Sequence, residues 1–386
     1  MNDTPARKAA SARGDVAPLD IVSVEALPVA LPLVKPVVMA GERIEKSRNL
    51  IVRVEARNGL VGWGEASSAP LMTGDVLPGM VAAVNDHLAP LVVGQDALAR
   101  AALGQRCSAA LLGNTGAKCA LDMALNDLVG RHLGVSLADL YGGRVRDTVV
   151  PMYLLGNPRV EDDIAEAKQK LADGWTFFKL KIGIKNPVEE ATAALAIRRE
   201  LGDRVALCAD ANMGMTFAAA QRFCEQARDA NLLFVEQPLH ADDLDGMAAL
   251  ARVSPIPLNG DESVGDIGSL LTLHRMGAAQ GANLKTIKLG GVANVARAMT
   301  VCGALGFSIN LACKVAESTI SAAALAQLGA IAPNLDWGLN VTNHYLAEDL
   351  SAAPVRIERG LVAVPTAPGL GVDIDEARVR RYVLRA

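Results

Sequence analysis

Aromatic residues are scarce in this sequence, at 3% of 386 residues. A core built mainly from rings is therefore excluded, although hydrophobic residues reach 51% and allow a large interior. That interior must consist mostly of Ala, Leu, Val and Ile. The length suggests two domains, or one large barrel with an attached domain.

Long blocks of like charge are also missing, and the formal net charge is only −4. This balance argues against nucleic acid or a membrane surface as a partner. No stretch is long and apolar enough to span a bilayer. Residues 1–18 mix Ala, Arg, Lys, Asp and Pro without the apolar centre of a signal peptide. We therefore expect a disordered tail and a cytoplasmic protein.

Cysteine and histidine clusters of the metal-binding type are absent. Cysteines stand at positions 107, 119, 208, 224, 302 and 313, none of them in a C-x-x-C pair. Several lie inside apolar runs, so we expect buried free thiols in a reducing compartment. The five histidines have no metal or dyad spacing and are expected to be surface or packing residues.

The N-terminal part contains the pattern of a small α+β domain, residues 19–145. Alternating apolar residues predict strands near 21–24, 50–55 and 62–66, joined as an antiparallel meander. Helical periodicity follows over 80–91, 97–112 and 117–133. Residues 35–47 and 67–79 are predicted to be loops, and the second is rich in Ser, Pro, Gly and Thr.

Strands and helices then alternate over residues 146–353. Strands are predicted near 148–154, 176–182, 205–210, 232–236, 256–261, 282–288, 306–312 and 334–337, and helices include 161–172, 187–201, 217–230 and 292–305. This alternation implies parallel strands with helices outside. Eight such strands fit a closed barrel better than an open sheet. Residues 354–386 are strand-like again and are expected to return to the N-terminal domain.

Charged residues close several of the predicted strands at regular intervals. They are Lys179, Lys181, Asp210, Glu236, Asp261 and Lys285. From Lys181 onward the intervals are 29, 26, 25 and 24 residues, about the length of one strand–helix unit. Because the C-terminal ends of barrel strands converge, we expect these side chains to form one site.

Three carboxylates held together resist ionisation unless a cation offsets their charge. An all-oxygen set favours Mg²⁺, with Mn²⁺ as a substitute. Any one of these acids could instead be a solvated or helix-capping residue, as Asp210 could be. The common register of Asp210, Glu236 and Asp261, with lysines on both sides, argues against that simpler interpretation. A substrate carboxylate on the metal would then have Lys181 on one face and Lys285 on the other, where either can move a proton.

Short stretches at these positions together resemble the muconate-lactonizing-enzyme subgroup of the enolase superfamily. They are Lys179-Leu180-Lys181, Asp210-Ala211-Asn212, Val235-Glu236-Gln237-Pro238, Gly260-Asp261-Glu262-Ser263, and Asn283-Leu284-Lys285 followed by Gly290-Gly291. The resemblance covers almost the whole chain and implies an α/β fold. The expected architecture is a modified TIM (β/α) barrel whose α+β capping domain is built from the N-terminal part and the C-terminal tail.

The same resemblance assigns roles to residues. Lys181 and Lys285 are implied as the acid/base pair and Lys179 as the residue that tunes Lys181. Asp210, Glu236 and Asp261 are implied as the Mg²⁺ ligands. Lys288 competes with Lys285 for the second role, and we choose Lys285 because the base of the family lies several residues before the Gly-Gly pair.

Two features of related subgroups are missing. The mandelate-racemase subgroup would need a histidine near the seventh strand end, which here is 307–312. Dipeptide epimerases carry an Asp-x-Asp on the eighth strand, and this chain has only Asp336 there. A dipeptide substrate is therefore not expected.

The resemblance implies abstraction of a proton α to a carboxylate through an ene-diolate. Glu317, Asp336 and Asn212 are predicted to bind the substrate, where the two acids would suit a cationic nitrogen. We therefore expect racemisation, epimerisation or dehydration of a small amino or imino acid, as in a cis-3-hydroxyproline dehydratase of amino acid metabolism. Muconate-type cycloisomerisation is the alternative. A Schiff-base aldolase that uses Lys179 or Lys181 is a remote one.

The expected partner is a small carboxylate, with no nucleic acid and no membrane. Capped barrels commonly associate, so we expect a homo-oligomer. By the same resemblance, the residues that select the substrate are expected in the capping segments 35–47 and 67–79 and after the last barrel strands.

Overall fold

The computed structural model describes residues 18–39 and 42–384. The tail predicted over residues 1–18 lies, apart from Pro18, outside the described residues. The chain opens with an antiparallel sheet of β1 (Ile21–Met39), β2 (Glu42–Ala56) and β3 (Val61–Ser67), in that order. The predicted meander is thereby confirmed.

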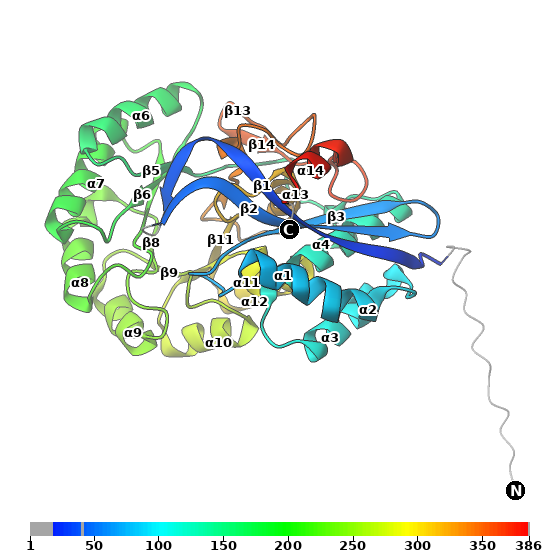
Figure 1. Cartoon of the computed structure of the whole chain (residues 1–386). Helices are drawn as coiled ribbons and strands as arrows, with labels where there is room; N and C mark the ends of the chain where they lie inside the picture. Colours follow the sequence, from blue (N-terminus) through cyan, green and yellow to red (C-terminus); the bar gives the residue numbers. More distant parts are fainter. Residues whose placement is uncertain (1–17, 40–41, 385–386) are drawn as a thin grey trace, which may run out of the picture.

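The loop predicted over residues 35–47 is wrong. There β1 and β2 continue as one hairpin, in which Val37 pairs with Ile44 after a register shift that follows Pro32. Pairing between the two strands holds the backbone extended although the side chains are mixed in polarity. In Figure 1 this hairpin, in dark blue, reaches from the cap toward the barrel.

Helices cover one face of this sheet. They are α1 (Leu77–Ala82), the π-helical turn η1 (Ala83–Leu88), α2 (Ala89–Val92), η2 (Ala97–Ala99), α3 (Arg100–Ala110), α4 (Thr115–Leu133) and α5 (Leu137–Leu140). The central helix α4 packs closely on β3. A Cβ on Gly64 would lie 1.9 Å from the carbonyl oxygen of Ala120, so only glycine allows this approach.

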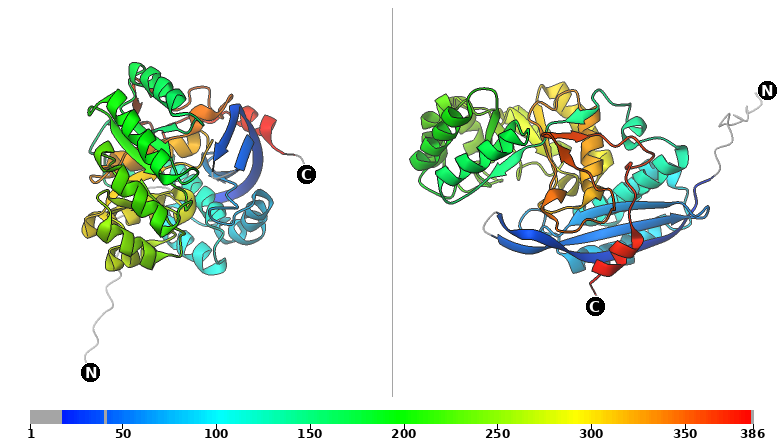
Figure 2. Two further views of the ribbon diagram at one scale, coloured as in Figure 1. Left: turned by 90° about the vertical axis from the view of Figure 1, so that its left-hand side faces the viewer. Right: turned by 90° about the horizontal axis from the view of Figure 1, so that it is seen from above.

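Eight parallel strands in sequential order form the second domain, a nearly closed barrel with helices outside (Figures 1 and 2). The strands are β5 (Tyr153–Leu155), β6 (Phe177–Lys181), β7 (Ala206–Asp210), β8 (Val235–Glu236), β9 (Leu258–Gly260), β10 (Gly281–Leu284), β11 (Ser308–Ala312) and β12 (Leu339–Asn340). The helices are α6 (Val160–Ala172), α7 (Pro187–Leu201), α8 (Phe217–Gln226), η3 (Arg228–Ala230), α9 (Leu244–Val253), α10 (Ile267–Met276), α11 (Thr286–Leu289), α12 (Val292–Leu305), α13 (Thr319–Ile331) and η4 (Asn343–Tyr345). Met152 N donates to Leu339 O at 2.7 Å, which joins the two ends of the sheet. The predicted barrel fold is confirmed.

The predicted strand over 334–337 is wrong, because the eighth strand is β12, two residues later. Trp337 instead packs its ring on Phe234, with centroids 4.6 Å apart, among residues from the N-terminal ends of the strands. Gly338 then turns the chain at φ +74°, where a Cβ would meet the Phe177 ring at 2.7 Å. Trp337 therefore fills the N-terminal end of the barrel and does not line a strand.

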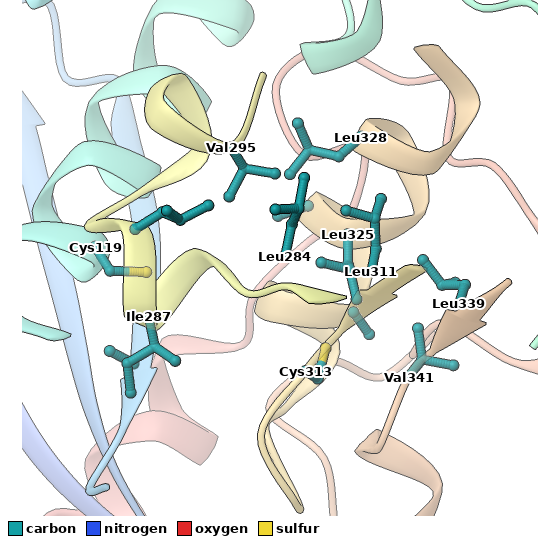
Figure 3. Packing of buried hydrophobic residues seen from close by; sticks show 14 of the residues in the cluster. Cys119, Leu284, Ile287, Val295, Leu311, Cys313, Leu325, Leu328, Leu339 and Val341 are labelled. Carbon is teal, nitrogen blue, oxygen red and sulfur yellow. The ribbon is translucent and has the colours of Figure 1, made fainter. Parts of the chain in front are cut away.

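Leucines on adjacent strands fill the space between barrel and helices. Leu284, Leu311 and Leu339 are neighbours in register. Figure 3 shows them beside Val295 of α12 and Leu325 and Leu328 of α13. Each fully buried leucine stabilises the fold by about 2 kcal/mol. All six cysteines are buried and free, as predicted.

The C-terminal segment divides between the two domains. Its hairpin, β13 (Ile357–Glu358) and β14 (Leu361–Ala363), pairs with β4 (Thr148–Val149). Helix α14 (Glu376–Tyr382) lies along β1 (Figure 2), where Arg380 Nη2 is 2.7 Å from Glu25 Oε2. Among the described residues, no helix combines the length and apolar character needed to cross a membrane.

Candidate active site

The lysines of β6 meet carboxylates from the next two strands. Lys179 and Lys181 point to the same side because they are two residues apart in a strand. Lys181 Nζ lies 2.7 Å from Asp210 Oδ2. Lys179 Nζ is 3.9 Å from that same oxygen and 2.7 Å from Glu236 Oε2. The two ammonium groups therefore share one carboxylate.

Lys179 is almost fully buried, with 4% of its side chain exposed. Burial by itself lowers the pKa of Lys179, but Glu236 and Asp210 outweigh burial and raise that pKa above its ordinary value. A Schiff-base nucleophile must be a neutral amine near neutral pH. Lys179 is therefore a fixed cation, which opposes the aldolase interpretation at this residue.

Asp261, which follows β9, forms ion pairs with two further lysines. Lys285 Nζ lies 2.5 Å from Asp261 Oδ2. Lys288, from α11, donates to the other carboxylate oxygen, to the Asp261 carbonyl and, at 3.1 Å, to the Asn283 carbonyl. Burial alone would raise the pKa of Asp261, but Lys285 and Lys288 hold it well below its usual range.

Glu236 lies between the other two acids and is 1% exposed. Its pKa is raised by burial and by the charges of Asp210 and Asp261, against the lowering effect of Lys179. Asn283 Nδ2 donates to Glu236 Oε1 at 2.9 Å. The three predicted metal residues thus come from neighbouring strands and act electrostatically on one another.

These residues suit a hard divalent cation by their chemistry, since every donor is a carboxylate oxygen. In the arrangement described, however, no three Asp, Glu, His or Cys side chains of residues 18–39 and 42–384 are close enough to share an ion. The oxygens of Asp210 and Asp261 face lysine ammonium groups instead. Asp210, Glu236 and Asp261 would hold such a cation through their carboxylate oxygens, beside the counter-charge that Lys181 and Lys285 provide.

Asn212, predicted to bind substrate, does reach the site. Its backbone N–H donates to Asp210 Oδ1 at 3.1 Å, and its side-chain oxygen accepts from Lys181 Nζ. Its side-chain nitrogen donates to Glu262 Oε1 at 3.0 Å. The sequence reasoning missed Glu262, although an acid directly after a candidate metal ligand was a usable signal.

Glu317 and Asp336, both predicted to bind the substrate, lie at opposite ends of the barrel strands. Glu317 accepts from Ser67 N at 3.3 Å and from Lys314 N at 3.1 Å, so it joins the barrel to the cap. Asp336 accepts from Ser308 Oγ at 3.2 Å, and Ser308 is the first residue of β11. Asp336 therefore lies at the N-terminal end of the strands, opposite the site, because the eighth strand begins later than predicted.

A cavity of about 720 Å³ lies between the hairpin β1–β2, the segment after β3 and the loop after β11. Its charged lining residues are Glu45, Lys46, Arg48 and Lys314. Positive charge therefore prevails on this side of the cap. A larger cavity of about 1420 Å³ lies between α3, α4 and α12 and includes Asp336. Neither cavity is lined by the strand-end lysines or carboxylates.

Comparison with known proteins covers both domains. Residues 162–378 match the family model described as enolase C-terminal domain-like. Residues 21–142 match the mandelate racemase / muconate lactonizing enzyme N-terminal domain. A chloromuconate cycloisomerase of Cupriavidus pinatubonensis is 32% identical over 92% of this chain and 96% of its own length. Muconate cycloisomerase 1 of Pseudomonas putida is 31% identical over 95% and 98%. The solved muconate lactonizing enzyme of Pseudomonas fluorescens, complexed with muconolactone, superposes with a TM-score of 0.90 at 30% identity, over 95% of this chain and 100% of that one.

Proposed function

Because the chain belongs to the muconate-lactonizing-enzyme subgroup of the enolase superfamily, whose enzymes generally depend on a divalent metal, we propose that it is a metal-dependent cycloisomerase of a muconate-type dicarboxylate. The observation that carries this proposal is similarity to cycloisomerases along both domains. The alternative expected from the sequence is thus favoured over a proline-type substrate. No relative reported above supports an amino acid, and Asp336 lies at the opposite end of the strands from the lysines.

Lactone formation adds a carboxylate oxygen across a double bond and a proton to the carbon next to the other carboxylate. In the proposal, Lys181 delivers that proton and removes it in the reverse direction. Lys285 supplies positive charge from the opposite side of the site. Asp210, Glu236 and Asp261 would hold Mg²⁺ or Mn²⁺, which when bound would stabilise the negative charge that develops on the substrate carboxylate.

The cap-side cavity, which the strand-end lysines and carboxylates do not line, would favour the approach of an anion from the cap. Lys46, Arg48 and Lys314 outnumber Glu45 in its lining. Such surroundings attract an anion and repel a cation.

The test compares substrates side by side with Mg²⁺ or Mn²⁺. We expect cis,cis-muconate or a chlorinated muconate to be consumed, with loss of diene absorbance, and EDTA to stop the reaction. Lys181→Ala should slow it by about 10²–10⁴-fold, the usual contribution of a general acid or base. Exchange or dehydration of cis-3-hydroxyproline or N-acyl amino acids, without consumption of any muconate, would refute the proposal.

A further inference from the structure

We propose that Glu262 is a positioning residue that holds Lys181 in place through Asn212. The proposal rests on the function proposed for Lys181, and it adds two side chains that act on the proton-transfer group without touching the substrate. It is carried by a continuous chain of hydrogen bonds from the end of β9 to the end of β6.

Only one orientation of the Asn212 side-chain amide satisfies both of its neighbours. Its side-chain oxygen faces the Lys181 ammonium group, which can only donate, and its nitrogen faces the Glu262 carboxylate. Its backbone is left-handed, with φ at 40°, a conformation that asparagine tolerates better than most residues. The backbone bond from Asn212 N to Asp210 Oδ1 fixes the turn. Both ends of the amide are therefore occupied by the protein.

Glu262 uses one oxygen for Asn212. The other, Oε2, is buried and has no hydrogen-bond partner among the described residues. A buried, half-satisfied carboxylate is costly and requires a compensating role. Holding the amide of Asn212 in the orientation that Lys181 needs is such a role.

Adjacent residues at the end of β9 thus serve opposite sides of the site. Asp261 bonds Lys285 directly, and Glu262 reaches Lys181 through Asn212. Lys181 has the more exposed side chain of the two lysines, 14% against 8%, and a flexible stem. If Asp210 turns to a metal ion, Asn212 remains as the partner that keeps Lys181 in position. Proton transfer depends on such positioning.

The test uses variants that respect the backbone. Asn212→Gly removes the amide and keeps the left-handed turn, and Glu262→Leu removes the acceptor. Glu262→Gln retains an oxygen that can accept from Asn212. Asn231→Gly is the control, because Asn231 is also left-handed, at φ 49°, and is exposed away from the site.

The first readout needs neither substrate nor metal. Lysines of the folded, metal-free variants are acetylated with acetic anhydride, and Lys181 and Lys285 are quantified by peptide mass spectrometry. We expect Lys181 to react roughly tenfold faster in Asn212→Gly and Glu262→Leu, as for the loss of one charge-assisted hydrogen bond. Lys285 should not change, and Glu262→Gln and Asn231→Gly should resemble the wild type.

The second readout is muconate turnover. The two disruptive variants should lose about tenfold in kcat with little change in KM, since placement of the proton donor matters in the transition state. A wild type that does not consume muconate would refute the proposed function. Acetylation would still test the relay, by which we mean the hydrogen-bond chain from Glu262 through Asn212 to Lys181. Unchanged Lys181 acetylation in Asn212→Gly would overturn the relay, even if Glu262→Leu failed to fold. A Glu262→Gln variant that behaved like Glu262→Leu would overturn it as well.

Discussion

At the scale of single residues, the site is defined by charged side chains that are mostly buried. Glu236 is 1% exposed and accepts from Lys179 and Asn283. Such burial is tolerable only because each carboxylate has an ammonium partner. A metal ion held by the three acids would add its positive charge to that of these lysines.

Replacing Glu236 tests whether the three acids bind a metal. Glu236→Gln removes the central negative charge but keeps the side-chain shape and leaves Lys179 with Asp210, 3.9 Å away. We expect a folded protein that has lost tight Mg²⁺ binding and turnover. In the wild type, Mg²⁺ at roughly 100 times its Kd should stabilise the fold by about 2.7 kcal/mol, measured by thermal unfolding.

Asp127→Asn is a suitable control, because Asp127 is an equally buried carboxylate that lies in α4 of the cap. It should lower the melting temperature and leave the response to Mg²⁺ intact. Normal turnover of Glu236→Gln in EDTA would show that the three acids are not a metal site.

At the scale of elements, the end of β10 decides which lysine can act on a substrate. The strand stops at Leu284, and α11 begins at Thr286 instead of continuing as the strand predicted to 288. Lys285 therefore lies at the strand end, and Lys288 lies in the helical turn beyond it. An ammonium group has three donors, and all those of Lys288 are used by Asp261 and Asn283. Among the described residues, Lys285 Nζ donates only to Asp261.

Methionine substitutions separate the two lysines. Lys285→Met should reduce turnover by about 10²–10³-fold, because the positive charge opposite Lys181 is lost. Lys288→Met should instead lower the free energy of unfolding by about 1–3 kcal/mol, since the two carbonyls and Asp261 lose a donor, with turnover largely kept. Steady-state rates and urea unfolding of both variants check this. The opposite order of the two activities would assign the second role to Lys288.

At the scale of the whole molecule, two buried acids join the cap to the barrel. Glu65 of β3 accepts from Ser318 N and Oγ and from Ser321 N at the start of α13, and from Asn49 Nδ2 at 2.7 Å. Glu317, just before that helix, accepts from Ser67 N. Burial and the nearby charge of Glu317 raise the pKa of Glu65 to about 7.

The raised pKa predicts how stability changes with pH. An unfolded glutamate ionises near pH 4.5, but Glu65 in the fold keeps its proton until about pH 7. Between these values the unfolded state loses its proton first and is favoured, so the free energy of unfolding should fall as pH rises from about 4.5 to 7. Glu317→Gln removes the like charge and should make this fall smaller and move it to lower pH.

Urea unfolding at a series of pH values measures the effect. Glu189→Gln, an exposed acid of α7, is the control and should follow the wild type. An identical pH profile for Glu317→Gln and the wild type would contradict the coupling between the two acids.

Local patterns in the sequence determined much of the fold. Helices predicted over 187–201 and 292–305 coincide with α7 and α12, because the apolar period, the caps and the flanking glycines are all local. The interval of one strand–helix unit likewise placed Lys181, Asp210, Glu236, Asp261 and Lys285 at neighbouring strand ends. Residues repeated at this interval become neighbours in space because the parallel strands of a barrel lie side by side.

The tertiary structure decided what local patterns could not contain. The sequence around Trp337 is typical of a strand. In the structure, however, the Trp337 ring packs on Phe234, the residue before β8, at the N-terminal end of the barrel. Hence Asp336 faces away from the site. The bonds between Glu65 and Ser318 join residues 253 apart, and those between Asn212 and Glu262 join residues 50 apart. Such contacts depend on how whole elements pack, and no local period of the sequence records that packing.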